Sequence, residues 1–482
     1  MDAADLDRKA RTGAGCIPAP LVARLLVLGH ESEVELQAGR GEWFCAREWA
    51  RLLGERGRRA EALEVLAPYL ATGWWPAARA RAELLEAWGR APEAIALARP
   101  YAVAGGPPLE FLARLLARHG HRDEAITLLS DGVEDGALAT ALVEVSEGAG
   151  RDEDVASLLA ARIPAGHRCD TPWCCRGLDP DTAAGLLATV RERQGRVDEA
   201  IALLRTRRIT SVNDDDQLAG LLARHGRTEE LGAYAVSEDH GHAARHLAGV
   251  LEARGDVEGA IAVYRRPDDS AERRYHGAFD LAALLARHGR GDEAIEVMRA
   301  LADPPGGAED CVVETLCTLY ADHGRADEGL EWLDALGARA GADVGAGAGA
   351  GAEEWEFFRV RLRLLAGLGR LDEAVERARA HPEGDTWYAA WTVSDLLAAA
   401  GRTEEAVALL EPHAHAHRTL LAGRLIDAGR VEDAVTLLQR HEPEPDTRQW
   451  WSAFADASRT DDADASGTDP YDPWSDTGAP AS

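Results

Sequence analysis

A glycine recurs along this chain at a nearly constant spacing and among similar neighbours. The heptapeptide LLARHGR stands at residues 221–227 and 284–290, and LLARHGH stands at 115–121. Most spacings between these glycines are 28 to 35 residues, and two are 45. A fixed period in this range indicates a solenoid of stacked repeats. The aligned positions are Gly57, Gly89, Gly120, Gly150, Gly195, Gly226, Gly255, Gly289, Gly324, Gly369, Gly401 and Gly429, and a weaker unit precedes them around Gly29.

Each repeat predicts two helices. Before Gly289, apolar residues at 278, 281, 282 and 285 follow one helical face, and residues 294–298 begin a second, shorter helix. The glycine suits the left-handed conformation that ends the first helix. Basic residues before it and acidic residues after it complement the two helix dipoles. Small residues recur seven positions before and five positions after the glycine, where they let the two helices approach closely. The second set includes Ala125, Ala200, Ala294 and Ala406.

This pattern resembles the tetratricopeptide repeat (TPR) family, in a divergent form of bacterial type. The resemblance rests on the leucine–small pair in the first helix, on the glycine, and on the D/E-E-A-I/V start of the second helix. One departure concerns the family's tryptophan, because an aromatic residue stands three positions earlier instead. We interpret these aromatics, Trp43, Trp75, Tyr275, Trp355 and Trp387, as packing between hairpins. The expected fold is an all-α, right-handed superhelical solenoid of about twelve to thirteen helix-turn-helix repeats.

Low-complexity segments divide the repeats. Residues 1–42 are predicted to hold a degenerate capping repeat, and residues 43–336 an N-terminal TPR-like array. The Gly/Ala-rich stretch 337–354 predicts a flexible linker to a C-terminal array at 355–440. Residues 441–482 are acidic and rich in Pro, Gly and Ser, which predicts a disordered tail.

Composition excludes several function classes. The formal net charge of −30 argues against partners that need a basic surface, namely nucleic acid and anionic membranes. Lys9 is the one lysine in the chain, and its context fits neither a P-loop nor a Schiff base. Seven scattered cysteines favour a reducing compartment. With no signal peptide or apolar span expected, the sequence predicts a cytoplasmic protein.

Candidate catalytic and metal-binding groups are few. The histidines at 119, 225 and 288 repeat with the turn motif, which favours a structural role at a helix end. The histidine pairs 242/246 and 413/417 are interpreted as solvated side chains. One weak metal candidate is a cluster whose cysteine spacing strains tetrahedral geometry, formed by His167, Cys169, Cys174 and Cys175. We therefore expect no enzyme activity and no cofactor.

Binding is expected on the concave surface that the first helices line. In the TPR family the groove is formed mostly by residues 13, 10 and 6 before the glycine, and Trp391 is the aromatic candidate that lies outside the repeated position. The resemblance implies a groove of Phe44, Arg47, Arg51, Arg79, Arg114, Arg245, Phe279, Arg359, Arg363, Tyr388 and Trp391. These arginines suit an acidic or carboxylate-bearing segment.

Three functions stay open at this point. The first is a scaffold or adaptor that binds a protein or an extended peptide in its groove without catalysis. The alternative is a regulator that senses a peptide or a small molecule. A metal-dependent enzyme using the 167–175 cluster is a distant third.

Overall fold

A computed structural model shows a chain built almost wholly of helices. It describes residues 2–13, 15–163, 178–207, 211–212, 215–237, 241–265, 271–304, 307–343 and 354–440. Within these ranges an N-terminal helix α1 (Ala3–Thr12) precedes thirteen helical hairpins. Two short strands, β1 (Ser211–Val212) and β2 (Asp215–Asp216), pair antiparallel just before α14. No helix in the described part of the chain is both long and apolar enough to cross a membrane. The predicted all-α solenoid is confirmed.

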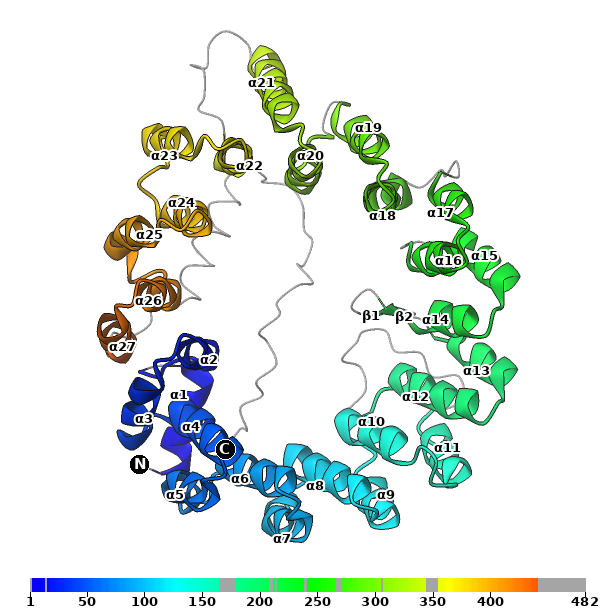
Figure 1. Ribbon diagram of the computed structural model, residues 1–482. Coiled ribbons are helices and arrows are strands. Elements are labelled where there is room, and N and C mark those ends of the chain that lie inside the picture. The colour runs from blue at the N-terminus through cyan, green and yellow to red at the C-terminus, as the bar shows by residue number, and fades with distance from the viewer. Residues whose placement is uncertain are drawn as a thin grey trace, which may run out of the picture.

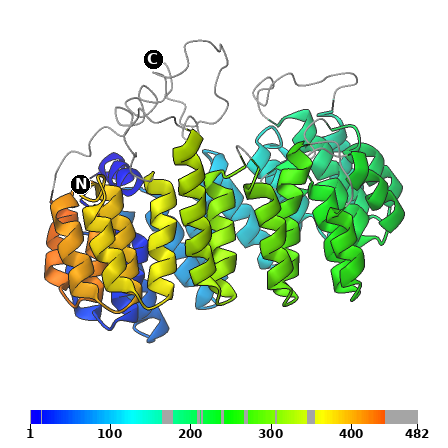
Figure 2. The same ribbon diagram turned by 90° about the horizontal axis from the view of Figure 1, so that it is seen from above.

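The hairpins stand side by side and form a closed ring (Figures 1 and 2). The first helix of each hairpin faces the centre. These inner helices are α2 (Ala19–Val27), α4 (Trp43–Glu55), α6 (Trp75–Ala87), α8 (Gly106–Arg118), α10 (Gly136–Val145), α12 (Pro180–Arg193), α14 (Gln217–Arg224), α16 (His242–Ala253), α18 (Ala271–Arg287), α20 (Asp310–Asp322), α22 (Trp355–Gly367), α24 (Trp387–Ala399) and α26 (Arg418–Asp427).

The second helix of each hairpin lies on the outside (Figure 1). The outer helices are α3 (Glu31–Gly39), α5 (Arg59–Leu70), α7 (Ala91–Ala102), α9 (Arg122–Ser130), α11 (Asp152–Ala160), α13 (Val197–Leu204), α15 (Thr228–Ser237), α17 (Val257–Tyr264), α19 (Gly291–Ala302), α21 (Ala326–Asp343), α23 (Leu371–Ala380), α25 (Thr403–Leu410) and α27 (Val431–Gln439). A 3₁₀ turn, η1 (Glu411–His413), follows α25.

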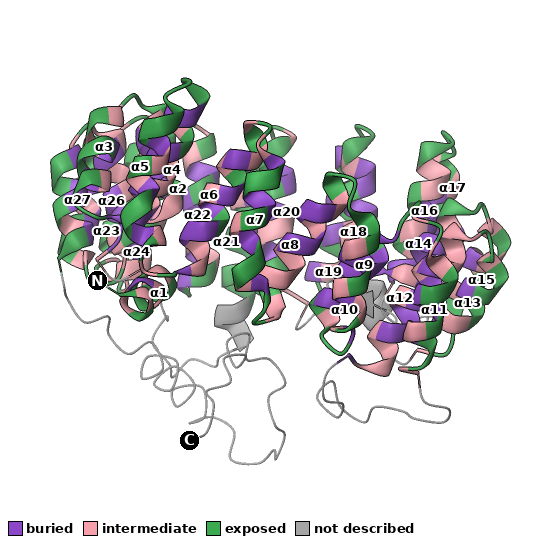
Figure 3. Ribbon diagram, turned by 90° about the horizontal axis from the view of Figure 1, so that it is seen from below, coloured by how far each residue is buried: buried purple, intermediate pink, exposed green. Residues whose placement is uncertain are grey.

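The glycine and the small residues act locally as the sequence suggests. Gly289 has a φ of 73°, the left-handed conformation that a β-carbon disfavours, and all the aligned glycines share a positive φ. Ala125, Ala200, Ala294 and Ala406 are completely buried where the two helices of a hairpin meet. Buried residues gather where neighbouring helices face one another, and exposed residues face away (Figure 3). The apolar core therefore runs through the wall of the ring.

The ring closes where the first hairpin meets the last. Helix α2 contacts α26, and one apolar core spans both ends of the chain. It contains Ile17, Val22, Leu25 and Val34 near the N-terminus together with Leu425, Ile426, Val435 and Leu438 from the last hairpin. Arg24 of α2 forms an ion pair with Asp427 of α26. Gln439 donates a 2.7 Å hydrogen bond to the side chain of Gln37. We call this junction the seam.

The predicted linker and tail fall largely outside the described residues. Helix α21 continues to Asp343, into the tract at 337–354, and the residues 344–353 are not described. Helices α20 and α21 both contact α22, and Val360 and Leu364 of α22 share a core with Leu333 of α21. The hairpin order thus continues across the tract. The predicted tail at 441–482 lies outside the described residues.

Arginine bridges join neighbouring hairpins at the turns. The residue after the repeat glycine is usually arginine, and seven of these arginines bind a carboxylate three residues later and another in the preceding hairpin. Arg290, for example, lies 2.6 Å from Glu293 and 2.6 Å from Glu258. The same double bridge is made by Arg151, Arg196, Arg227, Arg325, Arg402 and Arg430. The acidic residues in the first turns of the outer helices therefore link neighbouring hairpins, and they also complement the helix dipoles.

Enlarging a buried alanine should destabilise the ring. We expect Ala200→Leu to lower the free energy of unfolding by about 1–3 kcal/mol, because a larger side chain forces α12 and α13 apart. Chemical denaturation measures the change. Ala202→Leu is the matched control, since Ala202 is exposed on the same helix and should change stability by less than about 0.5 kcal/mol. Equal effects of the two substitutions would contradict this packing.

The turn bridges should be lost in acid. Arg290 and Arg265, which both donate to Glu293, lower the pKa of its carboxyl to about 2. A carboxyl with a lowered pKa stabilises the fold above its unfolded pKa, and this contribution fades as the pH falls toward the folded value. Glu293→Gln should therefore lower the melting temperature at pH 7, and the difference from wild type should shrink between about pH 4.5 and pH 2. Glu296→Gln, exposed on the same helix, is the control. A difference that stays constant with pH would refute the assignment.

Candidate functional site: the inner wall of the ring

Charge is distributed unequally between the two layers of the wall. Counted over the side chains that the structure describes, the inner helices carry 17 arginines and 16 carboxylates, whereas the outer helices carry 7 arginines and 30 carboxylates. The ten arginines that directly follow repeat glycines offset only part of the outer excess. The inner wall is thus nearly balanced in charge, and the outer wall is strongly acidic.

The sequence-predicted groove arginines lie on inner helices, and carboxylates of this chain face them. Arg359 of α22 lies 2.9 Å from Glu314 of α20 and 2.5 Å from Glu356. Arg363 forms a further ion pair with the same Glu314. The arginines therefore form a ladder of ion pairs along the inner wall. Its other members are Arg47–Glu48, Arg51–Glu48, Arg51–Glu55, Arg79–Glu83, Arg114–Glu110, Arg114–Glu144, Arg245–Asp280 and Arg424–Asp395.

The sequence does not reveal this ladder, because the two residues of each ion pair between different helices lie 29 to 49 positions apart in the chain. Most of the pairs within one helix do have a sequence signal, an arginine and a carboxylate three or four positions apart. The lowered pKa of Glu314, caused mainly by its hydrogen bond from Arg359, agrees with this pairing. An incoming anion must therefore compete with carboxylates that are already in place.

Aromatic side chains gather on the inner helices near the C-terminus. Trp355 of α22 is buried and contacts Phe358, His381 and Tyr388, with ring centroids 5.3 to 5.9 Å apart. Trp391 of α24 lies 5.5 Å from the ring of His417 and leaves 45% of its surface exposed. An exposed tryptophan supported by fixed neighbours is typical of a contact surface.

The other repeated aromatics pack between hairpins. Trp43 is buried against Tyr69 and Trp74 at centroid distances of 5.1 and 4.8 Å. Trp75 contacts Tyr101 and Phe111, which belong to the same and the next hairpin. Among the remaining candidates, Phe44 lies 5.9 Å from the guanidinium of Arg47, and Phe279 lies beside Tyr275. The packing interpretation of these tryptophans is confirmed.

The histidines of the turn motif bind the preceding hairpin. His225 Nε2 lies 2.9 Å from Glu192, and the adjacent Arg224 contacts the same carboxylate at 2.9 Å. His119 and Arg118 bind Glu86 in the same way, and His288 and Arg287 bind Glu252. The structural interpretation is thus correct, with a partner that the sequence did not reveal. The two histidine pairs differ from expectation, because His242 is buried and His417 lies under Trp387 and Trp391 instead of being fully solvated.

The candidate metal ligands His167, Cys169, Cys174 and Cys175 lie outside the described residues. Within the described part of the chain, no three His, Cys, Asp or Glu side chains are placed to hold a metal ion. A buried polar cluster does occur near the seam, where Glu42 receives a hydrogen bond from the backbone of Cys45. Burial raises the pKa of Glu42, and burial beside this carboxylate raises the pKa of the Cys16 thiol to about 11.

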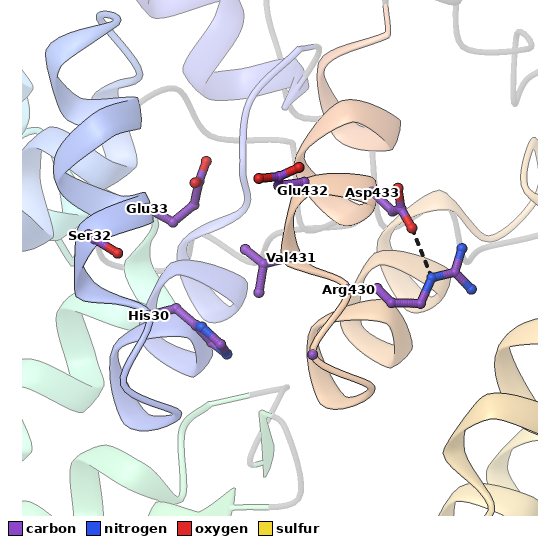
Figure 4. A pocket seen from close by; sticks show the side chains of 8 residues that line it. His30, Ser32, Glu33, Arg430, Val431, Glu432 and Asp433 are labelled. Carbon is purple, nitrogen blue, oxygen red and sulfur yellow. Dashed lines mark hydrogen bonds and ion pairs between the residues drawn. The ribbon is translucent and has the colours of Figure 1, made fainter.

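Two clefts lie on the seam. One, of about 410 Å³, separates the start of α3 from the start of α27 and is lined by His30, Ser32, Glu33 and residues 429–433. Figure 4 shows Glu33 and Glu432 extending toward each other from its two sides. The second, of about 130 Å³, includes Cys16, Glu42 and Gln439. Sequence reasoning did not find these clefts, because their walls come from opposite ends of the chain.

Comparisons with known proteins add nothing to the assignment of this chain. No family model matches this chain, and no curated protein does. A solved structure described as "Structure of Naa15/Naa10 bound to HypK-THB" is 14% identical, with a TM-score of 0.37 over 87% of this chain and 74% of that chain. This degree of likeness assigns neither a partner nor an activity. The array of helical hairpins itself fits a TPR-like repeat protein.

Cysteine reactivity should follow burial. Cys16, Cys45 and Cys317 are buried, and Cys311 is exposed. Since only a thiolate that is reachable from solvent reacts quickly, iodoacetamide at pH 8 should modify Cys311 at least about tenfold faster than the other three. Peptide-resolved mass spectrometry measures each rate, and the denatured protein is the control in which the rates should converge. Rapid modification of Cys45 in the native protein would contradict the placement of α4.

Proposed function

We propose that the ring is a non-catalytic scaffold that holds a protein or an extended peptide against its inner wall. The main support is the exposed ring of Trp391, which belongs to the inner helix α24 and contacts the ring of His417. Tryptophan at such positions commonly carries much of the energy of an interface. The outer wall would repel an acidic partner, because its carboxylates greatly outnumber its arginines.

The proposed partner contributes an apolar side chain at Trp391 and a carboxylate at the neighbouring helix α22. Arg359 and Arg363 share Glu314, and the side chain of Arg363 is 52% exposed. A carboxylate from the partner would reach Arg363 and partly replace Glu314. The partner carboxylate must compete with Glu314 and lose part of its own hydration, and the exposure of Arg363 keeps that loss of hydration small. An acidic segment therefore fits this region of the wall.

Substitutions on the inner wall test the proposal. Trp391→Ala should weaken binding of a co-purified polypeptide by about thirtyfold, the effect of removing a central tryptophan, and Arg363→Glu should weaken it by about tenfold or more. The polypeptide is captured from native cell extract on wild-type protein, purified, and titrated against each variant by calorimetry.

Val103→Ala is the matched control, since Val103 is 88% exposed but follows the outer helix α7. Wild-type affinity in all three variants would refute an inner-wall site. A partner that binds only at high ionic strength would also be incompatible with the carboxylate contact, because salt screens it.

A further inference from the structure

The described part of the chain ends close to the exposed tryptophan of the inner wall. The backbone carbonyl of Arg440, the last described residue, accepts a 3.1 Å hydrogen bond from Arg418, the first residue of the inner helix α26. His417 directly precedes Arg418, and the centroid of its ring lies 5.5 Å from that of Trp391. Residues 441–482 therefore begin beside an inner helix, a short step away from Trp391.

The sequence that follows Arg440 combines two features that rarely occur together. Most of it has the composition of a disordered segment, and such segments are typically poor in aromatic residues. Residues 450–454 nonetheless read WWSAF, and acidic residues follow at positions 456, 461, 462 and 464. The whole stretch 441–482 carries ten carboxylates against two arginines. An apolar cluster followed by carboxylates is what the proposed function requires of a partner at Trp391 and α22.

The inner wall near Trp391 carries the complementary charge. Helices α22, α24 and α26 together hold five arginines and three carboxylates. The described side chains of the other inner helices number twelve arginines and thirteen carboxylates. Of the five arginines, Arg361 alone is buried, where it pairs with Asp334 of α21. This part of the wall is thus positive in a chain whose net charge is −30.

We propose that residues 450–464 of this chain bind the inner wall, with the aromatic cluster on Trp391 and the carboxylates at Arg363. The ten residues 441–450 span up to about 33 Å when extended. Helix α24 has 13 residues and is therefore about 20 Å long, so the connection reaches any level of this helix. Asp456 lies five residues beyond Trp451, a reach of about 16 Å, and packed helices such as α22 and α24 are about 8–10 Å apart.

The covalent connection explains how this segment competes with Glu314 for Arg363. A segment joined by a short linker is present at its own site at an effective concentration of about 1 mM. It therefore occupies the site even when the same peptide, free in solution, binds only weakly. The inference rests on the proposed function for the site, and it adds an occupant: the chain blocks its own inner wall until a tighter partner displaces the segment.

A peptide of residues 446–464, carrying a fluorescent label, tests the proposal in titrations against the full-length protein. The tail variant Trp450→Ala/Trp451→Ala/Phe454→Ala removes the aromatic cluster from the chain itself. Fluorescence anisotropy should show the peptide binding this variant at least about tenfold more tightly than wild type, because the competing segment is gone. Adding Trp391→Ala to the tail variant should weaken the binding by about thirtyfold, and adding Val103→Ala should leave it unchanged.

Equal affinity of the peptide for wild type and the tail variant would overturn the proposal, and so would undiminished binding after Trp391→Ala. Wild-type protein that self-associates in sedimentation, where the tail variant does not, would place the segment on a second copy and overturn the intramolecular contact. The captured polypeptide separates the two proposals. If it still depends on Trp391 while the peptide does not bind, only the self-occupied site is refuted. If the peptide binds there and no captured polypeptide does, only the scaffold function is refuted.

Discussion

The close contact between the two helices of each hairpin governs the rest of this architecture. A completely buried alanine on the second helix, such as Ala200 or Ala294, lets that helix lie against the first with no bulky side chain between them. The left-handed glycine fixes the turn that brings the helices together. Because every hairpin pairs its two helices in the same way, successive joints turn the wall in the same direction. The ring closes because the turns at successive joints add up to a full circle.

Local features of the fold could be predicted from the sequence, and its closure could not. The glycines, the helix pairs and their apolar faces recur about every 30 residues, so each can be recognised by comparing one repeat with the others. Closure depends on a sum over thirteen joints, where an error of a few degrees at each one changes a ring into a spiral. The decisive contacts, such as Arg24 with Asp427, join residues that are 403 positions apart. No periodic pattern marks such a pair.

The candidate site, like the fold, could be predicted from the sequence only in part. The resemblance to TPR proteins correctly directs attention to the first helices, which line the inside of the ring. It predicts arginines such as Arg359 and Arg363 as groove-binding groups, and in the structure they share Glu314 of the neighbouring inner helix. Their pairing depends on which helices become neighbours, and thus on tertiary structure. Trp391 was identified because it departs from the repeat, and departures of this kind are where a repeat sequence carries individual information.

The mutual capping of the first and last hairpins also limits how such a protein can change over time. An open solenoid can gain or lose a repeat, since a new unit only lengthens the stack and the terminal caps still cover its ends. In this ring the apolar faces of α2 and α26 are covered by each other. An extra or missing hairpin would shift one end relative to the other and leave both faces open to water. The number of repeats is therefore fixed by geometry, and variation must occur within hairpins and their loops.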